Sequence, residues 1–401
     1  MTEQERKIAE LALEERAEFI CLTFCDVLGN ARNITLMPEE LEKAFDNGIS
    51  LDAAEITGFH TEAKIDLLVR PDASTYSVLP ESLTHQEENR IRRMFCHIYY
   101  PDGRLFENDG RTILEQAVKK AEEKGFTFNV GPAMEFYLLK EKGPELVPFD
   151  NAGYMSSFPD DRCEEIRREV LKALVQMGLQ PECAYHEAGP GQNKIKFRFS
   201  DPVKSADAVI AYKSLVRTIA ANHGLVADFS PKPLERLQGN SMHVNMSVNT
   251  SDGSDRTPHI IAGVLNRIPE MTLFLNPKRK SYRRLGHDNA PKYISWSDGN
   301  RSTLIRIPAY SGYTRFELRS PDCLANPYLA FALLIEACLY GIEEQPMLMK
   351  STDVDLFTAD NKSLPRLKTL PLSITEAQNQ AKRSDFVKQV LPASVIEAYL
   401  Q

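Results

Sequence analysis

Long apolar runs are missing from this chain of 401 residues. No stretch approaches the roughly 18–20 consecutive apolar residues that span a bilayer, so no membrane segment is expected. The opening stretch, residues 1–16, is charged and lacks the apolar core of a signal peptide. These absences predict a cytoplasmic protein without membrane contact.

Cysteine patterns that bind zinc or build a disulfide framework are also missing. The seven cysteines are an odd number at wide spacing, and no CxxC pair occurs. We therefore expect neither a disulfide framework nor a structural zinc site. The pattern is typical of reduced, mostly buried thiols in a cytoplasm.

An excess of positive charge is absent as well. Lys and Arg total 48 against 56 Asp and Glu, which gives a formal net charge of −8. This balance argues against non-specific binding of nucleic acid, although local basic pockets remain compatible with it. The composition, 42% hydrophobic and 26% charged, is ordinary for a soluble globular protein.

The first hundred residues predict a small domain of helices and strands. A helix over 4–18 precedes a strand over 19–26, and the turn residues Gly29-Asn30 lead to a returning strand over 31–36. A further helix is expected over 38–46 and further strands over 67–69, 75–79 and 93–99. The turn at 101–103 places the domain boundary near residue 102.

Helix and strand signals alternate after residue 102. Residues 194–199 alternate strictly, with Ile195 on the apolar side and Lys194 on the polar side, which predicts a half-buried strand. Strands are also expected over 126–130, 134–139, 181–186 and 242–248, and helices over 111–124, 160–177, 206–222, 327–340 and 374–390. Strands with charges on one side indicate an α+β protein whose sheet has one packed face and one working face.

Three clusters carry groups suited to chemistry, and each has an ordinary alternative. Glu135 stands in a hydrophobic strand, where an unpaired carboxylate is costly and an ion-paired one is common. His186-Glu187 precede a glycine-bearing segment, 189–194, which allows close approach to a ligand or forms a simple turn. His243 and Asn245 face one side of a strand, where His243 could also be a surface residue.

A fourth cluster is a series of arginines. Arg315 and Arg319 share a strand face with Glu317, and Arg301 and Arg306 come shortly before them. Several charges among apolar neighbours indicate a clamp for phosphate or carboxylate. The alternative is a solvated sheet face.

The order and spacing of these clusters resemble the glutamine synthetase family, from about Ile20 to the C-terminus. The resemblance is carried by residues 24–29, 131–137, 191–199, 231–233, 241–244, 281–285, 300–302, 305–308, 315–321 and 325–330. It implies a β-grasp domain over 1–102 and a glutamine-synthetase-type catalytic domain, a curved antiparallel sheet with helices, over 103–401.

The resemblance also implies a reaction and an assembly. The family transfers the γ-phosphoryl group of ATP to the side chain of glutamate, and ammonia attacks the acyl phosphate. ATP with Mg²⁺ or Mn²⁺ is the implied cofactor set, and a small carboxylate and an amine are the implied substrates. A homo-oligomer, as a hexameric ring or double ring with sites between neighbours, is the implied assembly.

The metal ligands of the family are only partly retained. Four of the six positions match, at Glu135, Glu187, His243 and Glu317. The other two hold Ala133 and Lys194 in place of glutamate, so each metal set lacks one ligand and fewer ions are expected. The ammonium of Lys194 could take the place and charge of an ion, or the side chain could extend along the sheet to solvent.

The ammonia side of the family site has changed too. Asp52 matches the ammonium-binding aspartate, but Ala53-Ala54-Glu55 follow it instead of Gly-Ser-Ser. Asn289 replaces the flap glutamate, with Asp288 as a candidate substitute, and Phe357 stands where some members are adenylylated, so that regulation is not expected. The implied catalytic residues are Asp52, Asp288, Asn289 and Arg301, and the implied substrate- and phosphate-binding residues are Arg284, Arg306, Arg315, Arg319, Gln192, Asn193, Lys194 and Ser241.

Three hypotheses follow from a site made about four charge units more positive than the family pattern. In the first, the protein is an ATP-dependent ligase that uses an amine other than ammonia. In the second, it is an inactive paralogue that binds a nucleotide or amino acid as a sensor or scaffold. In the third, the arginines serve a different chemistry, with fewer metals, on a carboxylated or phosphorylated substrate.

Overall fold

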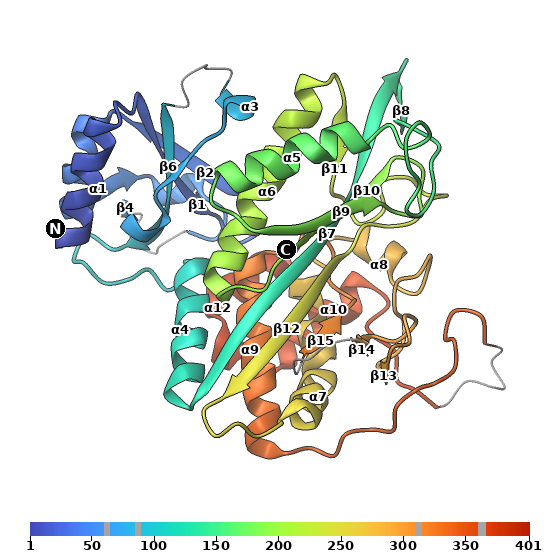
Figure 1. Ribbon diagram of the computed structural model, residues 1–401. Helices are drawn as coiled ribbons and strands as arrows, with labels where there is room; N and C mark the ends of the chain where they lie inside the picture. Colours follow the sequence, from blue (N-terminus) through green and yellow to red (C-terminus); the bar gives the residue numbers. More distant parts are fainter. Residues whose placement is uncertain (60–64, 85–89, 309–314, 360–365) are drawn as a thin grey trace.

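Two β-sheets organise the chain in the computed structural model, which describes residues 1–59, 65–84, 90–308, 315–359 and 366–401. The smaller sheet has the strand order β2-β1-β6-β4-β3, with β5 beside β6. The larger has the order β13-β14-β15-β12-β7-β10-β9, with β8 and β11 beside β7. Figure 1 shows the small sheet as a separate blue lobe next to the larger lobe, in which helices pack against the long strands.

The small lobe confirms the predicted hairpin. Its elements are α1 (Glu3–Glu14), β1 (Phe19–Cys25), β2 (Ala31–Leu36), α2 (Leu41–Asn47), β3 (Ile49–Leu51), β4 (Leu67–Pro71), β5 (Ser77–Val78), α3 (Glu81–Thr84) and β6 (Ile91–Tyr99). Asp26 accepts the backbone N–H groups of Leu28 and Asn30, and Gly29 takes φ +80° to close the turn. The first helix is shorter than predicted, because Arg16 adopts φ +53° and redirects the chain into β1.

The large sheet is built around one long strand. Its strands are β7 (Phe126–Lys142), β8 (Glu145–Pro148), β9 (Pro181–His186), β10 (Gln192–Phe197), β11 (Val226–Asp228), β12 (Met242–Thr250), β13 (Trp296–Asp298), β14 (Ile305–Ile307) and β15 (Arg315–Leu318). The separate strands predicted at 126–130 and 134–139 are continuous, because β12 pairs with β7 without a break from Thr250 to Met242. We expected an antiparallel sheet, but one pair differs, because β13 and β14 run parallel.

Helices cover this sheet and fill the core. They are α4 (Gly110–Glu123), α5 (Glu164–Gln176), α6 (Pro202–Asn222), α7 (Thr257–Leu275), α8 (Ser281–Arg284), α9 (Pro327–Glu344), α10 (Ile374–Arg383), α11 (Asp385–Val390) and α12 (Ala393–Leu400). The helix predicted over 374–390 is two helices, because Ser384 leaves the helical conformation and caps Val387. A Cβ at Gly263 would lie 2.3 Å from the Ala337 carbonyl, so this glycine lets α7 and α9 pack closely.

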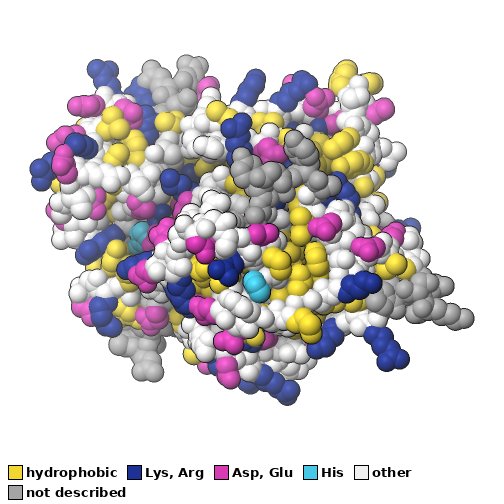
Figure 2. Space-filling model, turned by 60° about the horizontal axis from the view of Figure 1, so that its bottom comes forward, with side chains coloured by type: hydrophobic (Ala, Val, Ile, Leu, Met, Phe, Trp, Pro, Cys, Tyr) yellow, Lys and Arg dark blue, Asp and Glu magenta, His cyan; other side chains and the backbone are white. Residues whose placement is uncertain are grey.

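The surface carries charges of both signs. Figure 2 shows basic and acidic side chains interspersed over one face, with apolar side chains gathered near its middle. Among the described residues, we find no helix that is both long enough and apolar enough to cross a bilayer.

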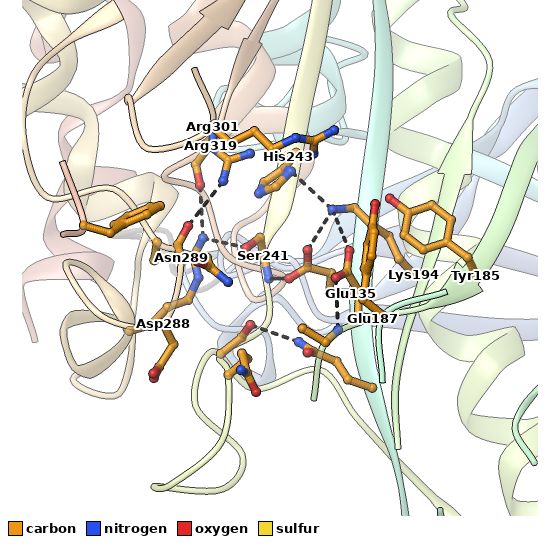
Figure 3. A pocket seen from close by; sticks show the side chains of 18 residues that line it. Glu135, Tyr185, Glu187, Lys194, Ser241, His243, Asp288, Asn289, Arg301 and Arg319 are labelled. Atoms are coloured by element: carbon orange, nitrogen blue, oxygen red, sulfur yellow. Dashed lines mark hydrogen bonds and ion pairs between the residues drawn. The ribbon is translucent and has the colours of Figure 1, made fainter. Parts of the chain in front are cut away.

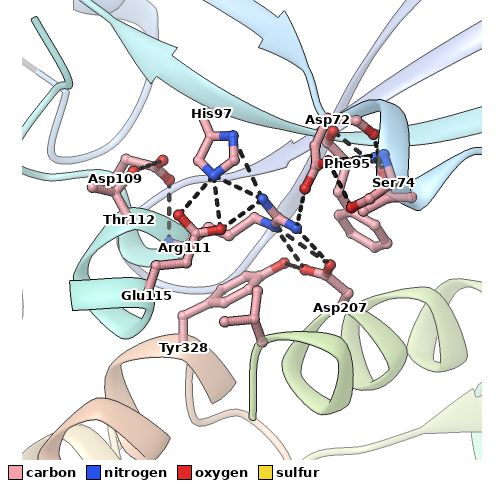
Figure 4. Close-up of polar contacts among 12 residues, drawn as sticks. Asp72, Ser74, Phe95, His97, Asp109, Arg111, Thr112, Glu115, Asp207 and Tyr328 are labelled. Atoms are coloured by element: carbon pink, nitrogen blue, oxygen red, sulfur yellow. Dashed lines mark hydrogen bonds and ion pairs between the residues drawn. The ribbon is translucent and has the colours of Figure 1, made fainter. Parts of the chain in front are cut away.

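One buried arginine ties the two lobes together (Figure 4). Arg111, on α4, donates to Asp72 of the small lobe at 2.8 Å and to Asp207 of α6 at 3.2 Å. It also donates to Glu115 at 3.0 Å, and Tyr328 of α9 donates to Asp207. Burial alone would lower the pKa of Arg111. The Asp207 and Asp72 carboxylates raise it by more, so the pKa lies above its ordinary value.

Replacement of Arg111 should therefore destabilise the fold strongly. We expect Arg111→Met to cost about 3–5 kcal/mol, because it leaves buried Asp207 without its cation. The measurement is urea unfolding followed by fluorescence. Arg104→Met is the control, since the Arg104–Asp102 pair is exposed and should hardly affect the unfolding midpoint. Equal effects of the two substitutions would contradict the assigned role of Arg111.

Candidate active site

A polar cavity of about 360 Å³ lies beside the working face of the large sheet (Figure 3). Strands β7, β10 and β12 supply its carboxylate, lysine and histidine groups, and the segment from Arg284 to Arg301 forms the facing wall. The predicted site residues that line it are Glu135, Glu187, Gln192, Lys194, Ser241, His243, Arg284, Asp288, Asn289, Arg301 and Arg319.

Lys194 lies at the centre of the predicted metal site instead of reaching solvent. Strand β10 pairs with β7 so that Lys194 stands opposite Glu135, and the side chain is buried. Its Nζ lies 2.8 Å from Glu135 Oε1, 3.3 Å from Glu187 Oε1 and 3.3 Å from His243 Nδ1. The ammonium group therefore contacts three of the four retained ligand positions.

The charge states of this group follow from burial and mutual attraction. Burial raises the pKa of Glu135, but Lys194 and His243 lower it to about 2. Burial lowers the pKa of Lys194, but Glu135 and Glu187 raise it above its ordinary value. Burial and the positive charge of Lys194 lower the pKa of His243 to about 4. Near pH 7 the cluster thus holds an ammonium, a Glu135 carboxylate and a neutral imidazole.

Glu317 is engaged on the other side of His243. Its Oε2 accepts Arg306 Nε at 2.7 Å and lies 3.7 Å from Arg319 Nη1, while its Oε1 lies 3.2 Å from His243 Nδ1. Burial raises the pKa of Glu317, but His243 and these arginines hold it well below its ordinary value. The fourth retained ligand is therefore a carboxylate already neutralised by guanidinium groups.

The residues do not fit the two-ion set that the family resemblance implies. Ala133 offers no ligand atom, and the Lys194 ammonium lies where three ligands converge. A divalent ion beside it would meet strong repulsion, since two unit charges 4 Å apart interact by roughly 4 kcal/mol at intermediate dielectric. We therefore assign no chemical step to a metal ion in this cavity.

Two buried arginines form the anion-binding side. Arg284 donates to the Ser320 carbonyl and to Ser241 Oγ, both at 2.8 Å, and Ser241 N–H in turn donates to Glu135 at 2.7 Å. Arg319 donates to the Asn289 carbonyl at 3.2 Å. Within the described part of the chain, neither Nε has a hydrogen-bond partner, so each guanidinium keeps a free donor. Exposed Arg301 adds a third cation to the wall.

Five predicted residues lie outside the cavity lining. Arg306, Arg315 and Glu317 lie on neighbouring strands, and Asn193 is buried with bonds to Arg167 and the Gly191 carbonyl. Asp52 is exposed in the small lobe, where it caps Ala54. The catalytic and binding roles of these residues remain predictions.

The flap segment has an unusual backbone. Asp288 and Asn289 take φ of +47° and +70°, the left-handed region that residues with side chains seldom adopt. The Asp288 carboxylate forms an ion pair with Lys232. Because this carboxylate is already paired, Asp288 is a poor substitute for the flap glutamate that the resemblance implies.

Sequence reasoning missed the two tyrosines of the cavity wall. The rings of Tyr154 and Tyr185 meet edge to face, with centroids 5.9 Å apart. Tyr185 stands two residues before Glu187 in a predicted extended segment, so strand alternation could have indicated it. Tyr154 lies in a loop, where no periodic signal exists.

A second group of ligand-type side chains lies nearby, at Asp150, Asp161, Cys163 and His186. Asp150 contacts His186 Nε2 at 3.0 Å and accepts the Gly191 N–H at 2.8 Å, and Asp161 pairs with Arg167. These contacts occupy the carboxylates with protein partners. The group is thus a hydrogen-bonded network that holds the end of β9, next to Glu187.

A β-grasp sheet followed by a curved sheet with carboxylates opposite arginines defines the class of two-domain, ATP-dependent carbon–nitrogen ligases. The model of the glutamine synthetase β-grasp domain matches residues 16–101, and that of the catalytic domain matches residues 107–401. The chain belongs to the glutamine synthetase family.

Relatives and solved structures agree with this assignment. A glutamine synthetase of Methanosarcina mazei is 39% identical over 98% of this chain and 92% of its own length. One of Thermus thermophilus is 36% identical over 96% and 91%. The solved structure titled "GmaS/ADP complex-Conformation 1" has a TM-score of 0.88 at 25% identity and covers 98% of this chain and 94% of its own.

Proposed function

We propose that this protein is an ATP-dependent ligase that joins a carboxylate to an amine other than ammonia, through an acyl phosphate. The observation that carries the proposal is a cavity that keeps its arginines but lacks an available carboxylate at the flap. Asn289 stands at the flap position, and Asp288 is paired with Lys232. Ammonium would therefore lose a stabilising negative charge there, while a larger amine can bind through other contacts.

The retained groups suit the anionic half of such a reaction. Arg284 and Arg319 are buried, held by backbone carbonyls, and line the cavity. Guanidinium groups held in advance stabilise oxygen atoms that gain charge as a phosphoryl group moves to a carboxylate. Similarity to the solved GmaS/ADP complex supports a nucleotide in this cavity.

One observation favours a second candidate, an inactive family member that binds a nucleotide or amino acid as a sensor or scaffold. Lys194 forms ion pairs with Glu135 and Glu187, which the resemblance implies as metal ligands. A cavity without its usual ions can still bind an anion through its arginines. It would do so without turnover.

ADP release separates the two candidates. The purified protein is given ATP, glutamate and Mg²⁺ with ammonia, short alkylamines, diamines or amino alcohols, each in turn. We expect ADP release with at least one organic amine to exceed release with ammonia about tenfold or more. If no amine causes ADP release but calorimetry shows ATP binding, the inactive candidate replaces the ligase. Silence without binding would contradict both.

A further inference from the structure

The environment of Lys194 resembles the surroundings of a bound cation more than those of an ordinary surface lysine. The side chain is 6% exposed, and its Nζ faces two carboxylates and an imidazole from three different strands or strand ends. Figure 3 shows the ammonium between His243 on one side and the carboxylates of Glu135 and Glu187 on the other. The ammonium has three N–H donors, and Glu135 Oε1, Glu187 Oε1 and His243 Nδ1 lie within 3.3 Å of it.

The two glutamates would otherwise oppose an anionic ligand. Glu135 Oε1 and Glu187 Oε1 lie 2.8 Å and 3.3 Å from the same Lys194 Nζ, so the two buried carboxylates would repel each other without it. Without a cation between them, their charges would face any phosphate held by Arg284 and Arg319. With the ammonium in place, one of these two negative charges is offset, so this wall repels the ligand less.

We propose that the Lys194 ammonium is a built-in replacement for a divalent cation, so that the cavity binds the polyphosphate of a nucleoside triphosphate as the metal-free anion. The lysine acts by offsetting one of the two negative charges of Glu135 and Glu187, while the arginines contact the phosphates. The inference rests on the proposed function in one respect, the identity of the nucleotide. The inference goes beyond the proposed function because it assigns the role of the cation to a side chain of the protein.

The first test is a titration with Mn²⁺ alone, followed by electron paramagnetic resonance of the free ion. We expect the wild-type protein to bind no Mn²⁺ in the low-micromolar to sub-millimolar range. Lys194→Glu alone, and Lys194→Glu with Ala133→Glu, should each bind Mn²⁺, because carboxylates replace the ammonium and the methyl group. Stoichiometric binding by the wild type would overturn the inference, whatever the nucleotide result.

The second test is calorimetry with ATP in Mg²⁺ and then in EDTA. The wild-type Kd should change less than about threefold between the two conditions. Lys194→Met should weaken metal-free ATP binding at least tenfold, because two carboxylates then face the phosphates. Lys196→Met is the matched control, since Lys196 is on the same strand but pairs with Glu182 outside the cavity.

The outcomes of the two tests are separable. ATP binding that requires Mg²⁺ in the wild type would overturn the inference. No ATP binding in either condition would remove the nucleotide from the proposed function. In that case the Mn²⁺ titration alone decides whether Lys194 replaces the ion, and circular dichroism of each variant shows that it is folded.

Discussion

The double variant Ala133→Glu, Lys194→Glu is expected to form glutamine from glutamate and ammonia at least about 100-fold faster than the wild type, in a Mg²⁺-dependent reaction. Single groups that stabilise charge at a transition state are typically worth 10²–10³ in rate. Both substitutions restore a carboxylate at a position where the family resemblance implies a ligand. The neighbouring ligands Glu135, Glu187 and His243 already converge on this point.

The measurement is chromatographic detection of glutamine, with and without EDTA. Ala133→Gln, Lys194→Gln is the matched control, because it has similar side-chain volumes but no added negative charge. Its rate should not rise above the wild-type level. A folded double variant that binds Mn²⁺ yet forms no glutamine would show that the lost ligands alone do not separate this cavity from the parent chemistry, and that the flap position at Asn289 also matters.

Removal of the Arg319 guanidinium should have an effect of similar size. We expect Arg319→Met to weaken ATP binding, or to slow ADP release, by about 10²–10³-fold, because a buried cation with a free Nε donor is lost from the anion side. Arg319→Lys should recover only part of the loss, since an ammonium lacks the planar pair of donors. Calorimetry and the ADP assay measure both effects.

The control for this substitution lies beside the other buried arginine. Arg283 is exposed and pairs with Glu235, so Arg283→Met should leave ATP binding unchanged. Glu317 keeps its contact with Arg306 when Arg319 is removed, so the variant should still fold. Equal ATP binding by Arg319→Met and the wild type would show that the anion binds elsewhere.

Local signals in the sequence predicted the elements that depend on local chemistry. Gly29 supplies the positive φ of the hairpin turn, and alternation in 194–199 predicted the strand that contains Lys194. The long match of motifs predicted the family and both parts of the fold, which the comparisons confirm. The expected loss of two metal ligands, at Ala133 and Lys194, rests on the family resemblance and stays a prediction.

Strand pairing decided what local signals could not. Residues 131–132 read as a break, but pairing with β12 carries β7 straight through them. The parallel pair of β13 and β14 joins strands that carry no sequence mark of their direction. The end of α10 at Ser384 became clear only from its capping contact with Val387.

The position of the Lys194 ammonium could not be predicted from the sequence and is decided by the tertiary structure. By itself, the sequence determined that a lysine stands on a polar strand face where the family resemblance implies a metal-binding glutamate, and it left two directions open for the side chain. The register of β10 against β7 brings Glu135 opposite, while β9 and β12 bring Glu187 and His243. Only the tertiary structure unites these acceptors, and a buried ammonium is stable there because they offset its lost hydration.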